Sequence, residues 1–572
     1  SGLTEETKVT ATREYKVSAK GTPGRLGISS EASRTGDQGP FMAIGLGGGA
    51  RREVHAPAAF GLCPENETHV PGSTEAYDTI TDNPFRLTSL PGNDASTFGV
   101  DVDTASYANV RRMLLAGQKP PAGAVRIEEL VNYFTYDYTA PPTEAGQPFA
   151  VHAEVAPCPW KAGNLLARVA IKGKVINQAQ RAAANLVFLI DVSGSMSSVN
   201  KLPLLKEAFK LLAGQLTGRD RVAMVVYAGS SGLVLPATEG SDRERIVGAL
   251  DRLQAGGSTN GASGITLAYQ VAREQFIAGG NNRVILATDG DFNVGISDRS
   301  SLVKMVEENA RSGVELTILG FGMGNYKDAT MQELSNKGNG NHYYIDSLRE
   351  ARKVLVDDLM GTLVTIAKDA KVQVFFNPAR VAGWRLIGYE NRLLAREDFN
   401  DDRKDAGEIG AGHTVTAFYE LVPAGGVVPG ATSDPNPFIT PAVTGEAAVT
   451  GDALLRLRLR HKPPGGEVSS LQEFDVRQNR QRLEDTTPDF RWAAAVAGFG
   501  MLLRDSPYAG DLTWAMVHDL AAGARGADAH GLRAEFLDLA RRAERLCPMV
   551  EVTPLDLAPD LPDLGTRLRP IK

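Results

Sequence analysis

The feature that most constrains this chain is a run of five apolar residues that ends abruptly in polar ones. The run extends from Leu186 to Ile190, and Asp191, Ser193 and Ser195 follow it. A short apolar run of this kind is typical of a strand buried on both faces of a parallel sheet. Ligands of such sheets bind beyond the carboxyl ends of the strands, so we expect the three polar side chains at that edge. One carboxylate and two hydroxyls there are suitable oxygen ligands for a hard divalent cation.

Two later segments supply further oxygen ligands. Gly256–Asn260 reads Gly-Gly-Ser-Thr-Asn before a predicted helix and contributes the hydroxyl of Thr259. Val284–Ala287 is a second apolar strand, and Asp289 follows it within a Thr-Asp-Gly sequence. The order strand–DxSxS, then GGxT, then strand–TDG resembles the metal-ion-dependent adhesion site of von Willebrand factor A domains. This resemblance covers roughly residues 182 to 366 and implies a doubly wound α/β domain.

Carried onto the matching positions, the resemblance implies a bound divalent cation, with Mg²⁺ preferred over Mn²⁺ and Ca²⁺. The implied ligands are Asp191, Ser193, Ser195, Thr259 and Asp289. Magnesium requires near-octahedral oxygens and usually retains waters, and the Asp or Glu carboxylate of a partner protein can replace one of them. We expect Asp291 to support the ligands without binding the ion itself. An EF-hand loop starting at Asp289 is excluded, because its seventh residue is Gly295 and its twelfth is Ser300 rather than Glu.

Two stretches outside the central domain indicate which group of von Willebrand factor A proteins the chain resembles. Gly99–Arg111 reads Gly-Val-Asp-Val-Asp-Thr-Ala-Ser-Tyr-Ala-Asn-Val-Arg, and Val125–Phe134 reads Val-Arg-Ile-Glu-Glu-Leu-Val-Asn-Tyr-Phe. Together with Thr288–Gly295 and the C-terminal segment, they resemble bacterial von Willebrand factor A proteins of the YfbK-like group. The resemblance extends over nearly everything from about residue 75 onward. It implies a shared architecture and leaves the ligand open.

The length of the chain predicts several domains, because 572 residues exceed what one hydrophobic core supports. We predict a flexible N-terminal extension (1–75), a module of helices and strands (76–181), the central domain (182–366), a β-rich module (367–484) and a C-terminal helical segment with a tail (485–572). Within the extension, the glycine-rich run Gly45–Arg52 lacks the preceding strand and the following Lys-Ser/Thr of a phosphate-binding loop. We therefore interpret it as a linker.

Alternating patterns predict strands on both sides of the central domain. The predicted strands are 96–103, 149–155 and 165–171 before it, and 371–376, 384–389, 413–422 and 454–459 after it. We hypothesise that they form one β-sandwich into which the central domain is inserted. In the last strand, leucines at 455, 457 and 459 alternate with arginines at 456, 458 and 460, which favours one buried and one solvated face over a basic ligand patch.

Helical patterns fill the remaining segments. In the central domain the expected helices are 203–216, 241–253, 262–276, 300–311, 329–337 and a long closing helix, 347–366; the C-terminal ones are 490–503, 512–522 and 528–546. A further helix through Leu115 is expected to be capped by Thr104 or Ser106. That assignment explains Asp101 and Asp103 better than metal binding does. In related adhesion domains the metal loop is coupled to the last helix, so ligand-linked motion of 347–366 is a further hypothesis.

Charge and composition indicate no nucleic-acid or membrane-spanning role. The net charge is −7, and no apolar run approaches the roughly 20 residues that cross a bilayer. The chain begins at Ser1 without a signal peptide, which we do not take as evidence for the cytoplasm. We expect an extracytoplasmic location, with a lipid anchor on a removed N-terminal segment. The thiols of Cys63, Cys158 and Cys547 match no zinc spacing, and buried free thiols are favoured over one disulfide plus a spare thiol.

The motifs favour a binding protein over an enzyme. The eight histidines are scattered, and no H-E-x-x-H, G-x-S-x-G or P-loop sequence is present. Asp191 and Asp289 could activate a metal-bound water for phosphoester hydrolysis, but we expect no His or Lys nearby in sequence to act as acid or base. The other alternative is a scaffold whose metal only orders its loops. We expect metal-dependent recognition of an acidic side chain.

Overall fold

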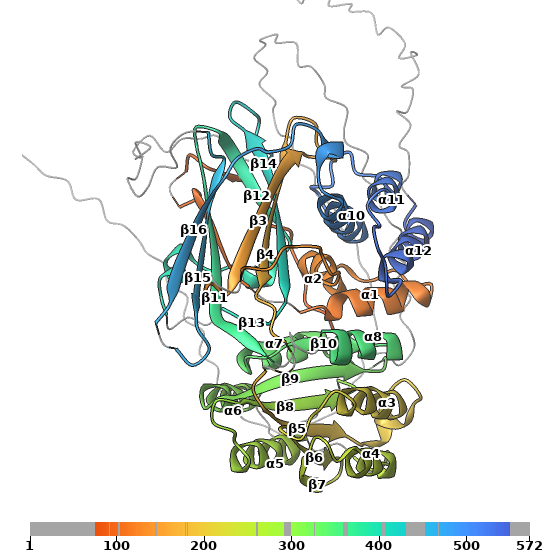
Figure 1. Ribbon diagram of the computed structural model, residues 1–572. Coiled ribbons are helices and arrows are strands. Elements are labelled where there is room, and N and C mark those ends of the chain that lie inside the picture. Colours follow the sequence, from red (N-terminus) through yellow and green to blue (C-terminus); the bar gives the residue numbers. More distant parts are fainter. Residues whose placement is uncertain are drawn as a thin grey trace, which may run out of the picture. The chain divides into compact units, whose positions relative to one another are not determined.

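The computed structural model describes residues 75–548, except residues 91, 101–102, 143–145, 178, 180, 259–260, 291–298, 325, 359–363, 403–405, 431–451 and 467. The predicted flexible extension before residue 75 lies outside the described residues, and so does the tail beyond Pro548. The described chain combines one α/β domain, two antiparallel sheets and a set of C-terminal helices (Figure 1).

A six-stranded sheet forms the core of the central domain. Its strand order is β10-β9-β8-β5-β6-β7, and every neighbouring pair is parallel except β6 and β7. The strands are β5 Ala184–Asp191, β6 Arg221–Tyr227, β7 Ser231–Glu239, β8 Asn281–Thr288, β9 Val314–Phe321 and β10 His342–Ile345. All eight residues of β5 are buried, because a central parallel strand is covered on both faces.

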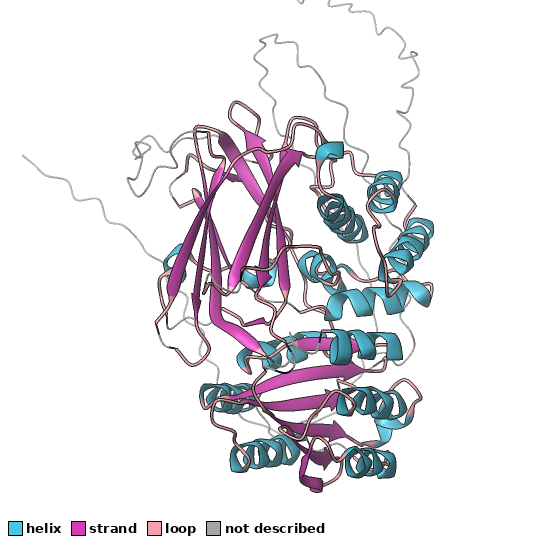
Figure 2. Cartoon of the chain, in the orientation of Figure 1, coloured by secondary structure: helices cyan, strands magenta, loops and turns pink. Residues whose placement is uncertain are grey.

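Helices cover both faces of this sheet, as Figure 2 shows. Phe188 of β5 packs in one core with apolar residues of α3 and α4, while Leu189 packs in a second core with α5, α6 and α7. These helices are α3 Leu202–Ala213, α4 Arg243–Arg252, α5 Gly261–Glu274, α6 Arg299–Arg311 and α7 Asp328–Lys337. Successive side chains of a strand point to opposite faces, so one apolar run supplies both cores. The predicted doubly wound fold is confirmed.

The predicted long closing helix over 347–366 was wrong. Helix α8 covers only Leu348–Arg352, a π-helical turn follows at Lys353–Asp357, and strand β11 begins at Thr365 and runs to Phe376. Thr365 and Ile366 are β-branched residues, which favour strands, and β11 pairs with β13, β15 and β2. Sheet pairing therefore overrides the helical pattern of apolar residues at this boundary.

Strands from both flanks of the central domain meet in two antiparallel sheets. One sheet has the order β1-β12-β14-β4-β3, and the other has the order β13-β11-β15-β16 with β2 added to β11. The strands are β1 Arg86–Leu87, β2 Ala95–Gly99, β3 Phe149–Pro157, β4 Leu165–Gly173, β12 Val381–Ile387, β13 Ile409–Gly410, β14 Thr414–Pro423, β15 Leu455–Lys462 and β16 Ser470–Val476. Val169 of the first sheet and Val372 of the second belong to the same core. The predicted insertion of the central domain into a two-sheet unit is thus confirmed.

The arginines of β15 lie on a solvated face. Leucines and arginines alternate along the strand between buried and partly exposed positions. Arg456 pairs with Asp475 at 2.6 Å, Arg458 pairs with Glu473 at 2.9 Å, and both acids lie on the neighbouring strand β16. These cross-strand pairs neutralise the face and support the interpretation as a solvated surface.

Helices of the N-terminal module and of the C-terminal segment share one core. The helices are α1 Ala105–Leu115, α2 Ile127–Asn132, α10 Pro488–Leu503, α11 Trp514–Ala522 and α12 Leu532–Leu546. Phe134 contacts Trp492 edge-to-face at 5.1 Å and Phe536 at 5.7 Å, which joins the two segments. Cys158 and Cys547 are both buried, as predicted, whereas Cys63 lies outside the described residues. Among the described helices, none has the length and apolar character needed to cross a membrane.

The expected side-chain cap of α1 is replaced by a longer-range contact. Thr104 is the N-cap residue, but its side chain makes no capping hydrogen bond. Instead, the backbone N–H of Ser106 donates to Glu129 Oε2 at 2.8 Å. A carboxylate near a helix N-terminus satisfies an N–H group that lacks an intrahelical partner, so a residue of α2 takes the capping role.

Candidate metal site

The two predicted acidic ligands lie on neighbouring strands of the central sheet. Asp191 is the last residue of β5, and Asp289 follows the last residue of β8. The two strands are parallel, with Ile190 opposite Ala287, so their carboxyl ends coincide. Both carboxylates are fully buried. The sheet therefore brings together two acidic groups whose repulsion a bound cation would relieve.

The loop after β5 folds back to present two hydroxyls. The backbone N–H of Ser193 donates to Asp191 Oδ1 at 2.9 Å, and a 3-10 turn follows at Gly194–Ser197. The hydroxyl oxygens of Ser193 and Ser195 lie 3.0 Å apart. Adjacent ligands of an octahedral magnesium ion, each 2.0–2.1 Å from the metal, are about 2.9 Å apart, and the longer bonds of calcium require a larger spacing. The spacing of 3.0 Å is compatible with two neighbouring ligands of magnesium, and it is also that of a hydrogen bond between the two hydroxyls.

Further donors fix the Asp191 carboxylate. Its Oδ2 accepts hydrogen bonds from the Tyr227 hydroxyl at 3.2 Å and from Thr288 Oγ1 at 3.3 Å. Burial raises the pKa of Asp191 to about 6; the hydrogen bonds from Ser193 oppose this rise, and the negative charge of Asp289 adds to it. A buried carboxylate that is oriented but costly to ionise is the type of group that a metal ion stabilises in its charged form.

The glycine pair of the predicted GGxT segment lies against the same loop. The backbone N–H of Gly256 donates to the carbonyl of Val192 at 2.8 Å, and that of Gly194 donates to the carbonyl of Gly257 at 3.0 Å. Thr259, two residues further on, lies outside the described residues, as does Asp291. The described parts of the three predicted segments thus converge at one sheet edge, while the roles of Thr259 and Asp291 stay predictions.

A lysine that the sequence interpretation missed enters this site. Lys201 Nζ donates to Asp289 Oδ2 at 2.8 Å, and only 7% of this residue is exposed. The sequence interpretation considered only His and Lys residues nearby in sequence, and it did not identify Lys201 beside the acidic pair. Lys201 stands six residues beyond Ser195, immediately before α3, and no pattern of spacing predicts which way such a side chain turns.

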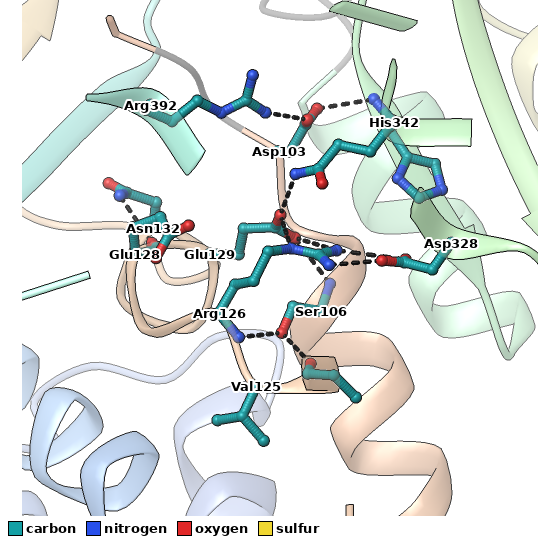
Figure 3. A network of polar contacts seen from close by, with 12 residues as sticks. Asp103, Ser106, Val125, Arg126, Glu128, Glu129, Asn132, Asp328, His342 and Arg392 are labelled. Carbon is teal, nitrogen blue, oxygen red and sulfur yellow. Dashed lines mark hydrogen bonds and ion pairs between the residues drawn. The ribbon is translucent and has the colours of Figure 1, made fainter. Parts of the chain in front are cut away.

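Asp103, which the sequence interpretation placed between a strand end and a helix cap, contacts two other parts of the chain. It accepts hydrogen bonds from the backbone N–H of His342 at 2.7 Å and from the guanidinium of Arg392 at 3.0 Å (Figure 3). These contacts join the N-terminal module to β10 and to the segment after β12. Its neighbour Asp101 lies outside the described residues.

Carboxylates and imidazoles do not gather elsewhere into an obvious metal site. Within the residues that the structure describes, no group of three or more His, Cys, Asp or Glu side chains could hold an ion together. The site at the ends of β5 and β8 depends instead on two carboxylates and on hydroxyls, which suit a hard cation such as Mg²⁺.

Three family models match consecutive parts of this chain. The model described as von Willebrand factor matches residues 71–168, the von Willebrand factor type A domain matches residues 185–357, and "Uncharacterized protein YfbK, C-terminal" matches residues 361–546. The central match includes the whole six-stranded sheet and the site at its edge.

Two relatives and one solved structure are similar to parts of this chain. Human inter-alpha-trypsin inhibitor heavy chain H4 is 32% identical over 148 residues, which cover 24% of this chain and 16% of that protein. The solved structure of von Willebrand factor type A from Catenulispora acidiphila is 15% identical and covers 68% of this chain and 89% of its own, with a TM-score of 0.39. The Escherichia coli (strain K12) protein described as "Uncharacterized protein YfbK" is 43% identical over 500 residues, which cover 86% of this chain and 85% of that protein. With this identity over most of both sequences, the chain belongs to the YfbK family of von Willebrand factor type A domain proteins.

Proposed function

We propose that this chain is a metal-dependent protein-binding module that recognises an acidic side chain of a partner protein. The observation that carries the proposal is the arrangement at the ends of β5 and β8, where two buried carboxylates adjoin a hydroxyl pair 3.0 Å apart. We assign the ligands as Asp191, Ser193, Ser195, Thr259 and Asp289, with Asp291 in support. The cation is Mg²⁺ in preference to Mn²⁺ or Ca²⁺.

The residues of the chain prepare the site for such a ligand. Tyr227 and Thr288 hold the Asp191 carboxylate from the side of the sheet, and Ser193 holds it from the loop. Ser195 is exposed, so the loop side of the site is open to solvent. When bound, the cation would supply the positive charge that attracts a carboxylate. The loop surface around it would then determine which acidic partner fits.

Two alternatives make different predictions. If the metal only orders loops, metal stabilises the protein but no partner binding depends on it. If the site hydrolyses phosphoesters, a generic phosphoester is turned over when metal is present. We favour binding because the sequence contains none of the hydrolase motifs considered above, and Lys201, a basic side chain beside the carboxylates, is paired with Asp289.

Thermal unfolding in EDTA, Mg²⁺, Mn²⁺ and Ca²⁺ tests the metal site. We expect Mg²⁺ to raise the unfolding temperature of the wild type by an amount that grows with the ratio of the Mg²⁺ concentration to its dissociation constant, and we expect no rise in Asp191→Ala. Asp538→Ala is a matched control, because this carboxylate pairs only across one turn of an exposed helix surface with Arg541. A control that also lost the metal response would contradict the assignment of the site.

Capture of partner proteins with and without EDTA then separates the alternatives. Retention of a protein by the wild type in Mg²⁺ but not in EDTA, and never by Asp191→Ala, is the expected result. Stabilisation by metal without any metal-dependent partner would favour the scaffold, and phosphoester turnover that Asp191→Ala abolishes would favour the hydrolase.

We also propose an extracytoplasmic location, with a lipid anchor on the segment that precedes this chain. Cell fractionation, combined with mass spectrometry of the N-terminus of the native protein, tests both. Recovery in the cytoplasmic fraction without a lipid modification would contradict them.

A further inference from the structure

Lys201 is held against the candidate metal site by the structure around it. The residue precedes α3, and its backbone N–H donates to the carbonyl of Ser198 at 2.9 Å. Its side chain runs past Gly322, which follows β9 with a φ of +78°. A Cβ atom at Gly322 would overlap the middle of the lysine stem, so the absence of a side chain there makes room for Lys201. The ammonium group is thereby directed to Asp289 and shielded from water.

The ammonium group of Lys201 changes the charge of the candidate metal site. Asp191 and Asp289 contribute two negative charges, and the hydroxyl ligands contribute none. A divalent cation would neutralise this pair. Lys201 adds one positive charge beside this pair, and that charge is only weakly screened because the carboxylates are fully buried and the lysine is 7% exposed.

We propose that Lys201 is a specificity-determining residue, which weakens metal binding and strengthens binding of an anionic ligand by the metal-loaded site. The inference rests on the proposed metal-dependent function. The metal-loaded site is one charge more positive with Lys201 than without it, so it attracts a partner carboxylate more strongly when Lys201 is present. A neutral ligand such as an amide gains nothing from the ammonium group. The partner chemistry selected is therefore an ionised Asp or Glu side chain over its amide.

The same ammonium group opposes the entry of the metal. It repels an incoming divalent cation and already partly neutralises Asp289. Removal of the charge should therefore have opposite effects on two equilibria, with tighter metal binding and weaker binding of the acidic ligand. A lysine that only packed the start of α3 would weaken both together or change neither.

Lys201→Met tests the proposal, because methionine keeps an unbranched apolar stem and removes the charge. Lys201→Arg keeps the charge and serves as the conservative variant. Lys206→Met is a matched control on the same helix, since Lys206 Nζ donates to the backbone carbonyls of Leu253 at 2.5 Å and Asp251 at 3.1 Å rather than to the site.

Two measurements on the full chain give the readout. Mn²⁺ titration followed by electron paramagnetic resonance gives the metal affinity. The water-proton relaxation of the Mn²⁺-loaded protein then reports displacement of metal-bound water by a blocked glycine–aspartate–glycine tripeptide or its asparagine counterpart. We expect Lys201→Met to bind Mn²⁺ about tenfold more tightly and the aspartate peptide about tenfold more weakly than the wild type, with Lys201→Arg and Lys206→Met close to the wild type.

The outcomes separate this inference from the proposed function. If the wild type binds Mn²⁺ and prefers the aspartate peptide, but Lys201→Met keeps both affinities or loses both, the role of Lys201 is overturned and the binding function stands. If the wild type binds no Mn²⁺, or binds it without preferring aspartate over asparagine, both are overturned. Should Lys201→Met fail to fold, Lys201→Gln is measured in its place with the same expected pair of opposite changes.

Discussion

At the scale of single residues, Asp191 links the stability of the protein to pH. Burial raises its pKa in the folded protein to about 6, above the value of about 3.9 for an unfolded aspartate. The folded state therefore binds this proton more tightly than the unfolded state does. The resulting stabilisation is complete below about pH 4 and is lost as the pH rises to about 6.

Denaturant unfolding in EDTA between pH 4 and 7 measures this effect. Relative to Asp191→Asn, the wild type should lose about 2 kcal/mol of unfolding free energy over this range, since one pKa unit corresponds to about 1.4 kcal/mol and the unfolded carboxyl is already partly ionised at pH 4. Saturating Mg²⁺ should reverse the trend, because the ion binds the ionised carboxylate. Parallel pH profiles of the two proteins in EDTA would show that Asp191 titrates normally.

The residues of the site differ in how far sequence could predict them. Asp191, Ser193, Ser195 and Asp289 follow apolar strands directly, and the end of a buried strand fixes where the next residues lie. Lys201 lies beyond a 3-10 turn, and its direction depends on Gly322, which is 121 positions away in the printed numbering. The contact of Lys201 with the site depends on backbone conformations in two distant parts of the chain, so no local sequence pattern predicts it.

At the scale of elements, α7 is fastened to the N-terminal module by a buried ion pair. The Arg126 guanidinium donates to both carboxylate oxygens of Asp328, the first residue of α7, at 2.5 and 3.2 Å, and it also pairs with Glu129 (Figure 3). Burial would raise the pKa of Asp328, but the positive charge of Arg126 outweighs it and holds that pKa below its ordinary value. The carboxylate therefore stays ionised inside the protein.

Removal of one partner from this pair should be costly. Asp328→Asn leaves the buried Arg126 with less compensating charge, and we expect a loss of about 3 kcal/mol in unfolding free energy. Asp538→Asn removes a carboxylate from an exposed pair and should leave the unfolding free energy nearly unchanged. Urea denaturation of the three proteins at pH 7 provides the comparison, and equal stabilities would show that the Arg126 contact is not important for the fold.

Helices and strands were predicted well where buried residues recur periodically along the chain. They were predicted poorly where pairing with a distant strand determines the secondary structure. In the strands of the central sheet and in β15, the pattern of apolar residues in the sequence matches the pattern of buried residues in the structure. The segment after α8 shows no such match, because Thr365 pairs with Gly410 of β13 and the following residues of β11 pair with β15, and both partner strands come much later in the chain. The Arg126–Asp328 contact likewise joins residues 202 positions apart.

At the scale of the whole described chain, the candidate metal site adjoins the segment that carries this ion pair. Gly290 follows Asp289 directly, and a Cβ atom there would overlap the backbone of Tyr326 and Lys327. Lys327 precedes Asp328, so the metal loop contacts the start of α7, which in turn binds Arg126. This gives a second route for coupling, in addition to the hypothesis that ligand binding moves the last helix of the domain.

The last helix is also connected to the N-terminal module. Glu350 of α8 accepts hydrogen bonds from Arg111 at 2.8 Å and from the Tyr133 hydroxyl at 2.7 Å, and all three groups are buried. Both α7 and α8 could therefore transmit a change at the site. The two helices differ in their contact with the metal loop. The residues nearest to a Cβ atom at Gly290 belong to the segment that leads into α7.

Hydrogen exchange with and without Mg²⁺ and the aspartate tripeptide distinguishes the two routes. We expect ligand binding to slow exchange in the first turn of α7 and in α2, since Gly290, Asp328 and Arg126 form one continuous path between them. Asp191→Ala under the same conditions is the control and should show no change. Identical protection of α8 in both states would refute coupling through the last helix, and identical protection of α7 and α2 would refute the path through Arg126. A change in α8 alone would place the coupling where related adhesion domains have it, despite the shorter helix of this chain.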